Sequence, residues 1–266
     1  MEIWVKLRMK EPPRKGDKND ASPPESCHEV PGLAIATRTV IHHSGNSHLR
    51  VPIHREGWLF IAIACAVNAI LFVLTPAAGW VFLPVTIWVI AFFRDPERRT
   101  PLEPDLYICP ADGKMLPVVQ APPPEELDMG PAPLTRLSVF MNVFNVHVNR
   151  IPCDGTVVGL SYRPGKFFNA SFDKASVHNE RMSIRIRPEG ATGPEKDIAL
   201  VQIAGLVARR IVCGLTPGQR VRRGERFGII RFGSRVDLYL PVNATIYAAQ
   251  GKTVTAGQTV LAGIKD

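Results

Sequence analysis

The chain has 266 residues, of which 45% are hydrophobic, so it can form one large domain or a domain with an appendage. This composition excludes a fibrous or wholly disordered protein. The 32 basic residues outnumber the 24 acidic ones, and the formal net charge of +8 favours an anionic partner.

The first segment, residues 1–55, is polar and rich in proline, and it has no periodic apolar face. Such a segment cannot bury enough apolar surface to offset the loss of chain entropy on folding. We therefore predict a largely disordered leader.

Residues 56–99 contain two apolar runs, 58–74 and 81–93, which are separated by a Pro- and Gly-containing turn at 75–79. Each run is shorter than the roughly 20 residues that a perpendicular helix needs to cross a bilayer, so two buried core helices are one interpretation. However, the runs are apolar on all sides and have arginines at both outer ends. These features predict a membrane-associated helical hairpin at the cell membrane, peripheral or hairpin-anchored, with both ends on the cytoplasmic side.

Residues 100–266 consist of short β-prone segments that are broken by Gly, Pro and Asp, which predicts a mainly antiparallel β domain. Two patterns recur within it. The Pro-x-Asp-Gly sequence at 110–113 returns at 152–155, and the Gly-x-x-Val-x-x-Gly sequence at 218–224 returns at 251–257. We predict a barrel-sandwich-like fold with internal repeats.

A Gly-Ser pair lies at residues 233 and 234. A serine that follows glycine in a strained turn can attack the carbonyl group before it and so cut the chain. By itself, however, the pair is more typical of an ordinary turn.

Several motifs together resemble those of the phosphatidylserine decarboxylase family, of the shorter bacterial type, and their order covers nearly all of the chain after residue 55. They lie at residues 56–58, 92–98, 110–113, 144–150, 168–171, 173–175, 179–181, 202–212 and 233–234. The chain differs from longer members of the family in two places. It has Phe-Gly-Ser-Arg at 232–235 where they have Leu-Gly-Ser-Thr, and it has one histidine, His147, with Arg150 nearby, where they have two.

The resemblance implies that the chain is a proenzyme that cuts itself between Gly233 and Ser234. The hydroxyl of Ser234 would attack the carbonyl of Gly233, and elimination followed by hydrolysis would leave a pyruvoyl group in place of the serine. The two resulting chains, 1–233 and 234–266, would stay associated. The pyruvoyl cofactor would form a Schiff base with phosphatidylserine and release carbon dioxide and phosphatidylethanolamine.

The same resemblance assigns His147 and Asp112 to catalysis, because a serine needs a base to take its proton and an imidazole oriented by a carboxylate is the usual base. His147 is also a candidate to reprotonate the substrate carbanion. From residue types alone, Asp112 is typical of an Asp-Gly turn and His147 of a hydrogen-bonded core histidine. We expect His178 to lie in a surface turn, with a position near the substrate as the alternative.

The expected partners are phosphatidylserine and an anionic membrane surface, with no nucleic acid, and a homo-oligomer is compatible with the sequence. The five scattered cysteines predict no metal site. Two other functions stay open. A pyruvoyl decarboxylase of a soluble amino acid would have no use for the apolar hairpin. A lipoyl- or biotinyl-like carrier module would use Lys114, but Gly113 precedes it where biotinyl carriers have methionine.

Overall fold

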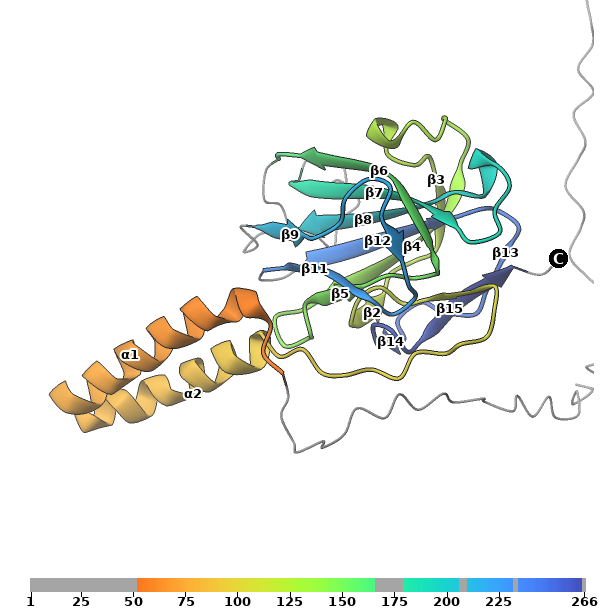
Figure 1. Ribbon diagram of the computed structural model, residues 1–266. Helices are drawn as coiled ribbons and strands as arrows, with labels where there is room; N and C mark the ends of the chain where they lie inside the picture. The colour runs from red at the N-terminus through yellow and green to blue at the C-terminus, as the bar shows by residue number, and fades with distance from the viewer. Residues whose placement is uncertain (1–51, 166–178, 206–209, 232–233, 265–266) are drawn as a thin grey trace, which may run out of the picture. The chain divides into compact units, whose positions relative to one another are not determined.

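The computed structural model describes residues 52–165, 179–205, 210–231 and 234–264, in which a pair of helices is followed by β-sheets (Figure 1). All strand pairings among these residues are antiparallel. The predicted fold class, mainly antiparallel β after a helical hairpin, is therefore confirmed. Gly233, His178 and nearly all of the predicted leader lie outside the described residues.

The hairpin consists of α1 (Trp58–Leu74) and α2 (Pro76–Phe92). The sequence predicted a five-residue turn at 75–79, but Thr75 alone separates the helices. The reason is that Pro76 occupies the first turn of α2, where its fixed φ and missing N–H are tolerated.

The outer surface of the hairpin is apolar and largely exposed. The exposed fraction reaches 86% at Val73 and 79% at Val81, which lie near the connection between the helices. Among the described residues, the stretch Arg55–Leu74, which includes the 3-10 turn η1 (Arg55–Gly57), is the one helix that could cross a membrane by length and composition. The core helix of a soluble protein can have the same length and composition, but most of its residues would be buried. Here only 17% of the apolar stretch is buried. The hairpin is therefore compatible with membrane association.

The β domain contains one nine-stranded sheet and two three-stranded sheets. The large sheet has the order β10-β6-β7-β8-β12-β4-β2-β14, and β3 also pairs with β4. The small sheets have the orders β1-β15-β13 and β5-β11-β9. The strand bounds are β1 (Leu106–Ile108), β2 (Gly113–Met115), β3 (Val119–Ala121), β4 (Leu134–Met141), β5 (Val148–Arg150), β6 (Gly155–Arg163), β7 (Arg181–Pro188), β8 (Ile198–Ala204), β9 (Ile211–Cys213), β10 (Arg220–Val221), β11 (Arg226–Ile230), β12 (Ser234–Leu240), β13 (Ala244–Ile246), β14 (Thr253–Val254) and β15 (Val260–Ile264).

The central strand β12 lies between β4 and β8, and every one of its residues is buried. Alternate side chains of a strand point to opposite faces of the sheet. Val236 and Leu238 accordingly pack into the main core, whereas Tyr239 packs with Val201 on the other face. The strand is therefore shielded from water on both faces.

The base of the hairpin packs on the β domain. Phe92 and Phe93 form an apolar cluster with Val148 of β5 and Ile229 of β11. The indole N–H of Trp88 also donates a hydrogen bond to the carbonyl of residue 143, at 3.3 Å. The hairpin thus contacts the small sheet β5-β11-β9 directly.

The two predicted repeats take the same local structure. In each, the valine of the Gly-x-x-Val-x-x-Gly segment is buried and pairs with the glycine of one Pro-x-Asp-Gly turn: Val254 with Gly113, and Val221 with Gly155. The first and last glycines of both segments have positive φ, a conformation that favours glycine. These angles are 81° at Gly218, 80° at Gly224, 76° at Gly251 and 74° at Gly257.

Candidate active site

Ser234 is the first residue of β12, and its side chain is fully buried. The sheet places it between Met141 of β4 and Ala204 of β8. Its Oγ lies 3.9 Å from the Sδ of Met141, and among the described residues this sulfur is the one acceptor that the hydroxyl reaches. Sulfur is a weak acceptor, so the serine oxygen is not held in a strong hydrogen bond.

His147 is also fully buried, and its ring lies against the ring of Phe92 with 4.2 Å between centroids. The imidazole Nδ1 is 3.0 Å from the carbonyl oxygen of Asn145. Because a carbonyl oxygen can only accept, Nδ1 carries the proton and the lone pair is on Nε2. Burial lowers the pKa of His147 to about 4, so the imidazole is neutral at pH 7.

Two contacts place His147 near the segment that leads to Ser234. Phe92, at the end of α2, packs against the imidazole ring of His147. The backbone carbonyl oxygen of His147 accepts a 3.4 Å hydrogen bond from the N–H of Ile230. Ile230 ends β11, four residues before Ser234. His147, which the sequence predicted as the base, therefore lies at the junction of the hairpin with β5 and β11.

Two amide side chains beside Ser234 were missed by the sequence reasoning. Asn149 and Gln202 are fully buried, and the Nε2 of Gln202 donates to the Oδ1 of Asn149 at 2.8 Å. The Nδ2 of Asn149 lies 3.8 Å from the same Met141 sulfur that faces Ser234. The Oε1 of Gln202 has no hydrogen-bond partner among the described residues. Buried polar atoms normally are hydrogen-bonded, so this acceptor oxygen, on a residue that pairs with Val236 two positions along β12 from Ser234, can accept from a bound group.

A signal for one of these amides is visible in the sequence. Gln202 is the one polar residue in β8, whose sequence is otherwise Ile, Ala, Leu and Val, and a buried strand rarely keeps a polar residue without a reason. Asn149 has no comparable signal, because its neighbours in β5 include a charged arginine.

Asp112 lies in the bend before β2 and is held by two partners. Its Oδ2 accepts from the guanidinium of Arg98 at 2.9 Å, and its Oδ1 accepts from the backbone N–H of Ala256 at 2.7 Å. In the described part of the chain, neither of these bonds goes to His147. The structure thus brings His147 and Ser234 to neighbouring segments, whereas Asp112 forms a separate ion pair.

Comparison with known proteins defines the class of enzyme. A family model described as phosphatidylserine decarboxylase matches residues 85–262. The phosphatidylserine decarboxylase proenzyme of Paramagnetospirillum magneticum is 53% identical over 218 residues, which cover 82% of this chain and 89% of that protein. The protein is thus a carbon–carbon lyase that removes a carboxyl group. The chain belongs to the phosphatidylserine decarboxylase family, which confirms the resemblance and sets aside the carrier module.

Proposed function

We propose that the protein cuts its own chain between Gly233 and Ser234 and then converts phosphatidylserine to phosphatidylethanolamine and carbon dioxide. The observation that carries this proposal is the burial of Ser234 at the start of the central strand, with a weakly bound hydroxyl. In the proposed processing, Oγ attacks the carbonyl carbon of Gly233 and the amide becomes an ester. Loss of the serine α-proton expels the Gly233 carboxylate, and water releases ammonia from the dehydroalanine that remains.

His147 is the proposed base for this processing. Its pKa of about 4 keeps it neutral, and its hydrogen bond to Asn145 leaves the lone pair on Nε2. A neutral imidazole can accept the serine proton at pH 7, and later the same group can return a proton to the substrate carbon.

The surroundings of Ser234 fit a pyruvoyl group, since the Nδ2 of Asn149 meets the weak Met141 sulfur at 3.8 Å and can donate to a carbonyl oxygen, while Gln202 holds Asn149 in place. Such a group supplies a carbonyl that condenses with the substrate amine and withdraws the electrons that carbon dioxide leaves behind. We propose that Asn149 and Gln202 hold it and that the packed core around β12 keeps water away.

Asp112 is proposed as a positioning residue in processing and not as a group that touches the serine. It pairs with Arg98, and the carbonyl of Pro110, two residues before it, accepts a 2.9 Å bond from the N–H of Arg150 in β5. The turn of Asp112 therefore braces the strand that immediately follows His147.

The helical hairpin is proposed to hold the enzyme on the cytoplasmic side of the cell membrane, where its substrate resides. Charged substitutions at its outer end test this without disturbing its base. Val73→Glu and Val81→Glu should release much of the protein from phospholipid vesicles, measured by flotation, because each places a charge in an apolar surface. Val242→Glu, at a position 67% exposed in the β domain, should float like the wild type. Equal flotation of all variants would place the membrane contact on the β domain instead.

The substrate is tested by incubating the purified protein with phosphatidylserine in detergent micelles and, separately, with free serine and phosphoserine. We expect phosphatidylethanolamine and carbon dioxide from the lipid and no carbon dioxide from the soluble compounds. Release of carbon dioxide from the soluble compounds alone would instead favour a decarboxylase of soluble amino acids.

A further inference from the structure

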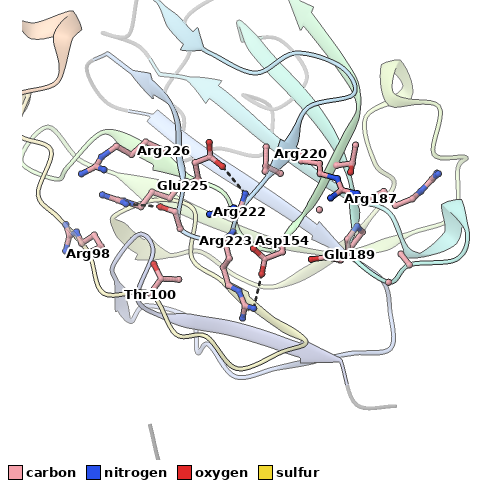
Figure 2. A pocket seen from close by; sticks show the side chains of 18 of the residues that line it. Arg98, Thr100, Asp154, Arg187, Glu189, Arg220, Arg222, Arg223, Glu225 and Arg226 are labelled. Atoms are coloured by element: carbon pink, nitrogen blue, oxygen red, sulfur yellow. Dashed lines mark hydrogen bonds and ion pairs between the residues drawn. The ribbon is translucent and has the colours of Figure 1, made fainter. Parts of the chain in front are cut away.

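An arginine-lined groove of about 1110 Å³ lies on the β domain, with Ser234 and His147 outside its lining (Figure 2). Its walls come from the linker after α2, the turn before β6, the end of β7 and the segment from β10 to β11. Seven arginines and four acidic residues line it, and neither Ser234, His147 nor Asp112 is among its lining residues. The groove therefore has an excess of positive charge, of which Arg98 and Arg150 also contact the turn of Asp112 and the other five arginines have no part in the proposed chemistry.

The strand register arranges part of this charge in a row. Thr156 of β6 pairs with Arg220 of β10 on one side and with Arg187 of β7 on the other. Residues directly opposite one another in adjacent strands point to the same face, and strands lie about 4.8 Å apart, so the two arginine Cα atoms are about 10 Å apart. The two arginines and the threonine between them all line the groove, and Figure 2 labels Arg187 and Arg220 there.

Some of the arginines are fixed by acidic residues, and others are not. Arg187 is held by the buried carboxylate of Asp197 at 2.8 Å, and Arg223 is held by Asp154 at 3.2 Å. In contrast, Arg220 and Arg222 are exposed, and their guanidiniums have no ion-pair partner within the described ranges. The groove therefore combines braced cations with cations that are available to a ligand.

A third feature is the crowding of like charges at the inner end. The guanidinium of Arg150 donates to the carbonyl oxygens of Gly224 at 2.8 Å and Pro96 at 2.9 Å. Burial lowers the pKa of Arg150, and the nearby charge of Arg226 lowers it further. Asp95 pairs with both arginines, at 3.6 Å to Arg150 and 2.7 Å to Arg226, so this end of the groove is braced and the available positive charge lies at Arg220 and Arg222.

We infer that the arginine groove is a second lipid site, which binds the phosphate of an anionic phospholipid that is not being turned over. Arginine matches phosphate because its planar fork donates two parallel hydrogen bonds. A lipid is favoured over a soluble phosphate because the groove begins in the linker that leaves the apolar hairpin. Arg98 in its wall follows Phe92 of α2 by six residues, at most about 20 Å of extended chain. The inference rests on the proposed membrane association but not on the role of Ser234.

The test uses the full chain and the double variant Arg220→Gln/Arg222→Gln, which removes the two available cations. Flotation is measured with vesicles of phosphatidylcholine alone and with added phosphatidylglycerol, an anionic lipid without the amine that turnover needs. The matched control is Lys114→Gln/Lys252→Gln, which removes the same charge from two exposed residues outside the groove. At about 1 kcal/mol per basic residue, the groove variant should bind phosphatidylglycerol vesicles roughly tenfold to thirtyfold more weakly than wild type, and the control should lose much less.

Two further measurements separate this inference from the proposed function. Binding to phosphatidylcholine vesicles and decarboxylation of phosphatidylserine in micelles should both be unchanged in the groove variant. Equal losses in the two double variants would reduce the effect to net charge and overturn the inference. Calorimetric titration with inorganic phosphate tests the alternative ligand, a soluble phosphate. If phosphate binds the groove and phosphatidylglycerol does not increase flotation, the site binds soluble phosphates and the lipid assignment is wrong.

Discussion

The turns that contain Asp112 and Asp154 are nearly the same structure with different neighbours. Asp112 accepts the backbone N–H of Ala256 at 2.7 Å, and Asp154 accepts that of Arg223 at 2.9 Å. Ala256 and Arg223 each directly precede the last glycine of their repeat. The turn chemistry of the two aspartates is thus equivalent.

The difference lies in what each turn holds. The carbonyl of Pro110 accepts from Arg150 in β5, which follows His147, whereas the carbonyl of Pro152 accepts from Ile108 in β1, which carries no candidate residue. Asp112 is also less exposed, with 14% of its side chain accessible against 38% for Asp154. The two turns therefore differ in the strand on which each docks, and this difference underlies the positioning role that we propose for Asp112.

We expect the largest loss of activity from removing the imidazole of His147, which directly precedes β5, the strand on which the turn of Asp112 docks. His147→Ala should slow both processing and decarboxylation by about 10²–10⁴-fold, because a positioned general base contributes that much. The measurement is turnover per molecule of the processed fraction, and added imidazole should restore part of it by entering the space beside Phe92. Normal turnover by processed His147→Ala protein would remove the histidine from catalysis.

The paired aspartates provide the next test. Asp112→Asn should slow chain cleavage by about 100-fold, because a small misplacement of the catalytic groups costs that much, whereas Asp154→Asn should cleave at nearly the wild-type rate. Asparagine keeps the turn hydrogen bond in both variants, so circular dichroism and thermal unfolding should be similar. Cleavage time courses that coincide would show that Asp112 only forms a turn.

A pH titration of stability probes the environment of His147. Burial lowers its pKa to about 4, against about 6.5 in the unfolded chain, so below pH 6.5 the unfolded state binds a proton that the folded state does not. The free energy of unfolding should therefore fall by about 2 kcal/mol from this group between pH 7 and pH 5. Denaturant unfolding on a Ser234→Ala background measures it, and adding His147→Gln should remove most of this dependence. An unchanged dependence would show that His147 is not buried as a neutral group.

The smallest expected effect concerns the glycines that open the two repeats. Gly218 and Gly251 have φ of 81° and 76°, and a Cβ at either would meet no atom within 4 Å. Each Gly→Ala change should therefore cost about 1 kcal/mol through backbone strain alone, equally at the two sites and without slowing cleavage. Gly159→Ala is the control, since a Cβ there makes an ordinary 3.5 Å contact. Unequal losses of stability would show that the repeats are not equivalent.

The sequence predicted those features that depend on local pattern. The apolar run at 58–74 became α1 with the same bounds, and the repeated Asp-Gly and Gly-x-x-Val-x-x-Gly sequences became matched turns. Long-range partners were not predictable, because the side chains of Asn149 and Gln202 meet across 53 positions of the chain. Likewise, nothing local to Asp112 indicates that Arg98 and Ala256 are its partners.

We propose Ser234 as the residue at which the protein cuts itself and forms its electrophile. Intact mass spectrometry of the purified wild-type protein and of Ser234→Ala tests it most directly. We expect two wild-type chains, 1–233 and 234–266, the second without a free amino terminus, and one uncut Ser234→Ala chain that makes no phosphatidylethanolamine. A Ser234→Ala protein that still separates into two chains, or an uncut wild type that is fully active, would contradict it.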